Sequence, residues 1–118
     1  MADGIGRIST HVLDTTLGIP AVGVAVQLEQ RNSAGSWHLV GTSQTDGDGR
    51  CKQLLPEPHD LSPGMYRIGF ETGDYFAARN MPGLYPVVEI TFEVRSGQTH
   101  LHIPLLLSPN GYTTYRGS

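Results

Sequence analysis

Apolar and polar residues alternate along most of this chain with a period of two. The first such run is "GRISTHVLD", residues 6–14, and it places Ile8, Thr10 and Val12 on the opposite side from Ser9, His11 and Leu13. Successive side chains of a β-strand point to opposite faces of a sheet, so this alternation is typical of a strand. The run therefore predicts the first strand of the fold.

Seven more segments carry strand-like patterns between turns rich in Gly and Pro. They are residues 22–32, 36–45, 50–55, 65–72, 85–95, 100–108 and 111–117. In the second strand, the inward set is expected to be Val22, Val24, Val26 and Leu28. The turns "SAG" and "SGQT" predict hairpins, and "DGDG" predicts a tight loop because Gly tolerates positive φ.

One segment departs from the alternation, "GDYFAARN" at residues 73–80. Ala77 and Ala78 favour a helix, Asp74 can cap it or lie in its first turn, and "MPG" ends it. About eight short strands and one small helix predict an all-β fold, an antiparallel sandwich of two sheets. With no linker and no repeat, residues 1–118 are expected to form a single domain.

Composition narrows the classes of partner. The net charge is −3 and the eight Lys and Arg are scattered, which gives no general attraction to nucleic acid or to an anionic membrane. A single Cys51 excludes an internal disulfide and removes the usual sign of a small secreted domain. No signal-peptide core, no Ser-Lys-Leu ending and no run of roughly 18 apolar residues is present. We therefore expect a cytoplasmic protein.

The pair "HLH" places His100 and His102 on one face of the same predicted strand. Their Cα atoms would lie about 7 Å apart, twice the rise per residue. Two such imidazoles suit a metal if a third ligand comes from another strand, but no Asp, Glu or Cys lies beside them in the sequence to complete a site. The alternative, which the spacing favours, is an ordinary half-exposed strand with Leu101 and Ile103 facing inward.

His11 and Arg50 are also open to two interpretations. A lone His on a strand is usually a surface residue, and Arg50 after "DGDG" can be a solvated cation. Arg50 can equally be a fixed guanidinium fork for a carbonyl, carboxylate or oxyanion. The chain contains no G-x-S-x-G elbow, no P-loop and no dinucleotide fingerprint. Spacing alone therefore predicts a β-sandwich with a few candidate polar side chains and names no reaction.

Four separated segments, in order along the chain, resemble one known family. They are "ISTHVLDTTLGIPAVGVAVQL", "DGDGR", "GDYFAARN" and "HIPLLLSPNGYTTYRGS". These segments are similar to the transthyretin-like proteins, and the "YRGS" ending is similar to the tetrapeptide that marks the 5-hydroxyisourate hydrolases within that family. Hormone-carrying transthyretins share the "LLSP" turn but lack this ending.

The resemblance implies a transthyretin-like sandwich of two four-stranded sheets with a short helix, assembled as a homotetramer, a dimer of dimers with sites in the channel between them. The site residues that it implies are His11, Arg50, His102 and Ser118 as catalytic residues, and His11, Arg50, Tyr115, Arg116 and Gly117 as substrate-binding residues. It assigns no role to His100 and implies no metal and no cofactor. Residues 115–118 are expected to form channel wall rather than a loose tail.

The implied reaction is hydrolysis of a ring amide of 5-hydroxyisourate, which gives 2-oxo-4-hydroxy-4-carboxy-5-ureidoimidazoline in urate degradation. His102 with His11 suits activation of water, Arg50 suits the oxyanion and Tyr115 suits the flat ring. One alternative is a carrier that holds a flat aromatic ligand in the same channel without chemistry. Another is an adhesion or carbohydrate-binding module, although Trp37 alone does not supply the exposed aromatic row that such a module needs.

Overall fold

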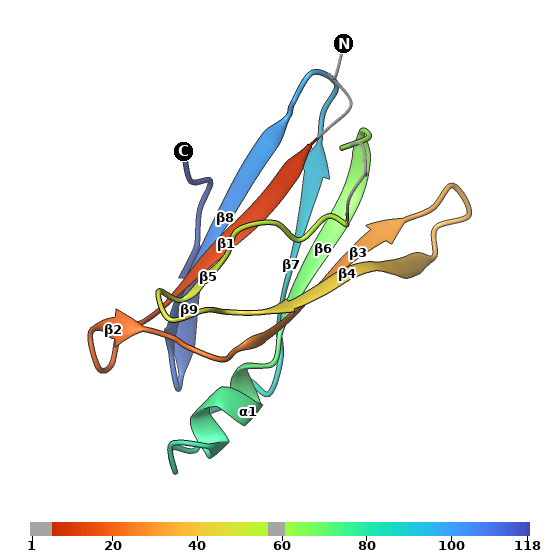
Figure 1. The fold of residues 1–118 in the computed structure, drawn as a ribbon. Coiled ribbons are helices and arrows are strands. Elements are labelled where there is room, and N and C mark those ends of the chain that lie inside the picture. Colours follow the sequence, from red (N-terminus) through yellow and green to blue (C-terminus); the bar gives the residue numbers. More distant parts are fainter. Residues whose placement is uncertain (1–5, 57–60) are drawn as a thin grey trace.

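The computed structural model describes residues 6–56 and 61–118, which form two sheets and one helix (Figure 1). One sheet, called the β1 sheet below, has the order β2 (Ile19–Pro20), β1 (Arg7–Asp14), β8 (His100–Ser108) and β9 (Gly111–Thr114), and β5 (Arg50–Cys51) also pairs with β1. The other, called the β3 sheet, has the order β4 (Trp37–Gln44), β3 (Ala25–Arg31), β6 (Gly64–Phe70) and β7 (Val88–Val94). Each sheet therefore follows a path of four strands, with β5 as an addition to the first.

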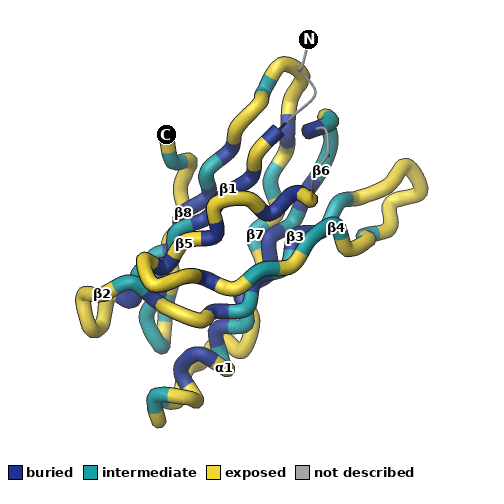
Figure 2. Tube along the Cα trace, in the orientation of Figure 1, coloured by how far each residue is buried: buried dark blue, intermediate teal, exposed yellow. Residues whose placement is uncertain are grey.

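The buried residues of the two sheets form one hydrophobic core. Figure 2 marks the buried positions along both sheets in dark blue. As predicted, Val24, Val26 and Leu28 are buried, and so are Val88 and Val94. The prediction for Val22 is wrong, because its side chain is 43% exposed. Gly23 has φ +80°, a left-handed conformation that breaks the extended run, so the alternation that faces the core begins only after it.

The sequence predicts an antiparallel sandwich, but one pair of strands in the structure is parallel. Strands β1 and β8 run parallel, with Ile8 opposite Leu101 and Val12 opposite Leu105. These strands come from distant parts of the chain, so no hairpin fixes their relative direction. The predicted hairpin at "SGQT" is also wrong, because β7 belongs to the β3 sheet and β8 to the β1 sheet. That turn carries the chain from one sheet to the other.

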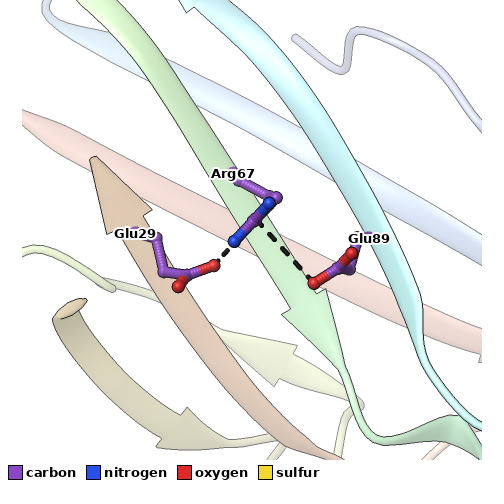
Figure 3. A network of polar contacts seen from close by, with 3 residues as sticks. All are labelled: Glu29, Arg67 and Glu89. Atoms are coloured by element: carbon purple, nitrogen blue, oxygen red, sulfur yellow. Dashed lines mark hydrogen bonds and ion pairs between the residues drawn. The ribbon is translucent and has the colours of Figure 1, made fainter. Parts of the chain in front are cut away.

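The outer face of the β3 sheet carries a network of opposite charges (Figure 3). The Arg67 guanidinium lies 2.8 Å from Glu29 and 3.8 Å from Glu89. The same guanidinium lies 4.4 Å from the centre of the Trp37 ring. Because the Arg67 guanidinium lies between two carboxylates of opposite charge, this face is a solvated polar surface rather than a charged site.

The predicted helix is present as α1 (Thr72–Ala77), which begins one residue earlier than expected. Asp74 lies in its first turn and is not a cap, since the N-cap position is Glu71 and no side chain caps it. Three residues of this helix are buried, namely Thr72, Tyr75 and Phe76. No helix among the described residues is long and apolar enough to cross a membrane.

A buried carboxylate ties this helix to the end of β1. Asp14 is fully buried, and its Oδ1 accepts hydrogen bonds from the backbone N–H groups of Thr16 and Leu17. Its Oδ2 accepts a hydrogen bond of 2.8 Å from the Tyr75 hydroxyl. Burial, the hydrogen bond to Asp14 and its negative charge raise the pKa of Tyr75 to about 12, so the phenol remains a donor at neutral pH.

We expect Tyr75→Phe to lower the free energy of unfolding by about 1–3 kcal/mol, because it leaves Asp14 Oδ2 buried with one donor fewer. Urea denaturation monitored by circular dichroism measures the change. The matched control is Tyr112→Phe on β9, whose side chain is 42% exposed. Equal stability of the two variants would show that the Asp14 contact contributes nothing to the fold.

Candidate active site

The outer face of the β1 sheet gathers polar side chains from three strands. Alternation turns Ile8, Thr10 and Val12 into the core and leaves Ser9 and His11 on the other face. In the parallel ladder Ser9 is the partner of His102, and in the antiparallel ladder His11 is the partner of Arg50. Residues that are far apart in the sequence therefore meet on one face because of strand register.

The loop before β5 holds Arg50 in place. Asp46 Oδ1 accepts hydrogen bonds from the backbone N–H groups of Asp48, at 2.9 Å, and Arg50, at 3.0 Å. These hydrogen bonds hold the pKa of Asp46 below its usual range. Gly49 has φ +78°, and a Cβ there would lie 2.5 Å from the Val12 carbonyl oxygen. Only glycine fits this close approach, so the loop delivers Arg50 to β1 in one conformation.

His11 is held by the same loop. Its Nε2 lies 2.9 Å from the Asp48 carbonyl oxygen. A carbonyl oxygen only accepts hydrogen bonds, so this contact assigns a proton to Nε2 of His11 and leaves Nδ1 as the other functional atom. His11 is thus oriented beside Arg50 by backbone atoms.

The surroundings of His102 shift its pKa. This residue is half-buried, and its Nδ1 lies 2.8 Å from the Ser9 hydroxyl oxygen. Burial lowers the pKa of His102 below its usual 6.5, and the positive charges of Arg50, His100 and His11 lower it further. The imidazole is therefore neutral at pH 7 and able to accept a proton.

A cavity of about 370 Å³ opens beside these residues. Cys51 and Ser118 line it, together with three cationic side chains and two imidazoles: Arg7, Arg50, Lys52, His100 and His102. No Asp or Glu of the described residues lines this cavity. Unlike the outer face of the β3 sheet, this cavity lacks compensating acids, and its potential favours an anion.

Residues 115–118 lie across His102, but not as a continuous strand. The predicted strand ends at Thr114, because continuing the register would pair Tyr115 with Pro104, which has no N–H to donate. The Thr114 hydroxyl instead donates to the Pro104 carbonyl at 2.8 Å. The chain then returns to the ladder, where the Gly117 N–H donates to the His102 carbonyl at 2.9 Å.

Gly117 packs directly on the His102 ring. A Cβ at this position would lie 2.5 Å from Cδ2 of the imidazole. This segment therefore needs glycine in order to cover the histidine. On its other side, Tyr115 and Arg116 line a second cavity of about 370 Å³, which His102 also borders.

The structure thus brings Arg50, His102 and Ser118 together at the first cavity. His11 is the cross-strand partner of Arg50 but does not line the cavity, and Tyr115 and Arg116 line its neighbour.

Six residues that line the first cavity received no role from sequence reasoning, and three of them, Arg7, Ser9 and Lys52, lie on the same strand faces as predicted site residues. Period-two alternation was the signal that could have found them, because Arg7 and Ser9 share a face with His11, and Lys52 shares one with Arg50.

The structure also bears on the metal alternative for His100 and His102. Their ring centres lie 6.5 Å apart. Among residues 6–56 and 61–118, no group of three or more His, Cys, Asp or Glu side chains is placed to bind a metal ion. The third ligand that this alternative requires is therefore not found in the described part of the chain.

Comparison with known proteins places this chain in a family. The HIUase/Transthyretin family matches residues 8–117. The 5-hydroxyisourate hydrolase of Salmonella typhi is 44% identical over 118 residues, which cover 100% of this chain and 85% of the relative.

Two solved structures have the same fold. The Klebsiella pneumoniae 5-hydroxyisourate hydrolase matches with a TM-score of 0.84 at 32% identity, over 97% of this chain and 100% of that one. Sea bream transthyretin in complex with thyroxine matches with a TM-score of 0.87 at 31% identity, over 94% of each chain. The predicted transthyretin-like sandwich is therefore confirmed, and this chain belongs to the HIUase/transthyretin family.

Proposed function

We infer that this protein is a 5-hydroxyisourate hydrolase of urate degradation, which converts its substrate to 2-oxo-4-hydroxy-4-carboxy-5-ureidoimidazoline. One observation carries the inference: a chain that matches named 5-hydroxyisourate hydrolases along its full length brings a neutral histidine and a fixed arginine to one basic cavity. The hydrolysis of a ring amide needs an activated water and a stabilised oxyanion, and this pair of side chains suits both tasks.

In the proposed mechanism His102 is the general base. Its lowered pKa leaves the imidazole unprotonated at neutral pH, and proton transfer to such a group is efficient when its pKa lies near the working pH. His11 supplies the second imidazole from the adjacent strand, with its Nε2 proton fixed on Asp48. Water then attacks the carbonyl carbon as its proton passes to His102.

Arg50 is the proposed oxyanion stabiliser. Its guanidinium is permanently charged and presents several N–H donors in a fixed plane, which Lys cannot reproduce. The Asp46 turn holds the backbone of Arg50, so little reorganisation is needed when charge develops in the transition state. Ser118 lines the same cavity, and Tyr115, Arg116 and Gly117 are proposed to bind the flat ring.

The mechanism uses no metal and no cofactor. A strained, electrophilic ring needs only general acid–base help, which the two histidines supply.

The alternative function is that of a carrier, as in the sea bream transthyretin whose structure contains thyroxine. The fold alone does not discriminate, since this chain resembles the carrier and the hydrolase equally well. A site for an aromatic ligand is mostly apolar with a few polar groups. The cavity found here is lined by Arg7, Arg50 and Lys52 as well as two histidines, which favours the enzyme.

We also propose a cytoplasmic homotetramer, a dimer of dimers in which a second dimer covers the outer face of the β1 sheet. Several apolar side chains on or beside this sheet are 42–53% exposed in the single chain: Leu17, Ile19, Val22 and Tyr112. Burying them against another subunit would remove apolar area from water. The same contact would enclose the open cavity. The cytoplasmic location rests on the single cysteine.

We expect His102→Asn to lower kcat by a factor on the order of 10², the usual scale for loss of a general base. Loss of ultraviolet absorbance from freshly generated 5-hydroxyisourate measures the rate. In the parent protein, kcat/KM should fall as pH drops through the lowered pKa of His102, below 6.5, because the protonated ring cannot accept a proton. A variant as fast as the parent would remove His102 from the mechanism, and a parent protein that binds the substrate without turnover would favour the carrier.

Gly117→Ala should lower kcat by about tenfold or more, because its Cβ would displace the His102 ring by the overlap described above. The matched control is Gly111→Ala at the start of β9, where the atom nearest to a new Cβ, Ser108 Oγ, is 3.7 Å away. Circular dichroism confirms that both variants fold. If the two variants lose activity to the same extent, the loss does not come from contact with His102.

The tetramer predicts that sedimentation velocity gives about four times the mass of one chain, by the closed symmetry usual for such assemblies. The specific activity should fall on dilution as the tetramer dissociates and the cavity opens to water. Replacing the exposed Leu17 by Glu should shift this dissociation to higher protein concentration. A monomeric species that keeps full activity would show that one chain completes the site.

A further inference from the structure

A hydroxyl group that the proposed mechanism does not use connects two histidines of the cavity. Ser9 Oγ lies 2.8 Å from Nδ1 of His102 and 3.1 Å from Nε2 of His100. Ser9 is only 7% exposed, and β-ladder pairing with His102 holds it in place. The two imidazole centres are 6.5 Å apart, so Ser9 bridges rings that do not bond to each other directly.

The proton count of this bridge allows two arrangements. A hydroxyl donates one hydrogen bond and accepts others, and each neutral imidazole has one N–H and one lone pair. In the first arrangement Ser9 donates to His100 and accepts from Nδ1–H of His102, which leaves the lone pair of His102 on Nε2. In the second arrangement Ser9 donates to Nδ1 of His102 and accepts from Nε2–H of His100, which requires that His102 has gained a proton at Nε2 and that His100 has released one from Nδ1. A shift of protons along the bridge therefore switches His102 between base and acid.

We propose that Ser9 and His100 form a proton relay that switches His102 between its two roles and exchanges the transferred proton with solvent. This relay rests on the proposed hydrolase function. His100 is exposed and lines the cavity, whereas His102 is half-buried, so the outer histidine is the one in contact with bulk water. Ser9 and His100 are positioning residues, since both act through His102.

The relay keeps protons and bonds in balance. As the oxygen of water bonds to the ring carbonyl carbon, Nε2 of His102 takes the water proton. The Nδ1 proton then passes to Ser9 Oγ while the hydroxyl proton of Ser9 passes to Nε2 of His100. When the C–N bond breaks, Nε2 of His102 gives its proton to the leaving nitrogen as the bridge runs backwards and restores Nδ1–H, and a His100 that has released its proton to water takes one back from water for this step.

The charges around His102 favour passing a proton outward. Arg50 on β5, His11 on β1 and His100 on β8 all lower the pKa of His102. On its other side, Glu93, Arg95 and Arg116 line the second cavity that His102 borders. A protonated His102 therefore faces mostly positive neighbours, while His100 can release its proton to water.

The test compares His100→Gln, Ser9→Ala and Ser9→Thr with the parent in weak buffer. His100→Gln retains a side-chain amide that can hydrogen-bond Ser9 but cannot carry a proton, so we expect kcat to fall by about tenfold and added imidazole to restore it. Ser9→Ala should lower kcat at least as much, and added imidazole should not restore it, because the missing hydroxyl lies at a buried position that imidazole cannot reach. Ser9→Thr keeps the hydroxyl and should stay within about threefold of the parent.

The pH profile adds a second readout. His100 is one of the groups that lower the pKa of His102, so His100→Gln should raise this pKa and move the acid limb of kcat/KM to higher pH. The matched control is His38→Gln, an exposed histidine on β4 of the other sheet, which should change neither rate nor profile. If imidazole fails to restore His100→Gln, or if Ser9→Ala keeps kcat within twofold, the relay is wrong.

Nitrogen NMR of the resting protein tests the bridge without any substrate. In Ser9→Ala, the ¹⁵N shifts of both His102 Nδ1 and His100 Nε2 should change relative to the parent, because both lose the same partner. Unchanged shifts would contradict the relay even in an active enzyme. A parent protein that shows the bridge but does not hydrolyse 5-hydroxyisourate would contradict the proposed function. The relay would then have no role in that reaction.

Discussion

The parallel pairing of β1 with β8 is the constraint on which the rest of the structure depends. It sets Ser9 opposite His102 on the outer face and Ile8 opposite Leu101 in the core. Because the period of a strand is two, a slip of one residue would exchange these faces and destroy the core and the site together. A buried hydrogen bond of 2.6 Å from the Thr10 hydroxyl to the Ile103 carbonyl helps to hold this register. Packing of the core therefore fixes the positions of the side chains on the outer face.

Fixing these side chains close together brings like charges near one another. Arg7, Arg50 and Lys52 share one cavity with two histidines, and like charges in a partly dry site repel one another. The fold tolerates this because the lowered pKa of His102 keeps that imidazole uncharged at neutral pH and because the arginines and the lysine border open solvent. Binding of an anionic or electron-rich ring would relieve the repulsion. The site is thus less stable empty than occupied, as expected where electrostatic complementarity is aimed at a ligand rather than at the fold.

Local rules in the sequence predicted much of this arrangement. Alternation identified the strands and their inner residues, and the Gly-rich loop before Arg50 was evident from its composition. The direction of β8 relative to β1 was not predictable, because it depends on a long-range pairing that no turn residue encodes. The interruption at Pro104 also depends on which residue lies across the ladder. Ser9 escaped attention for the same reason, since its importance comes from its neighbours and not from its own residue type.

The β1–β8 ladder also has a consequence for the time at which the protein becomes active. Strand β1 leaves the ribosome long before its parallel partner, residues 100–108, has been made. Until then, β1 has only β2 and β5 as partners, and the nascent chain holds an exposed edge where the ladder will form. Residues 115–118 complete the cover of His102 later still. Assembly of the site therefore waits until residues 100–118 have been made, and a chaperone would be most useful while the edge of β1 is still unpaired.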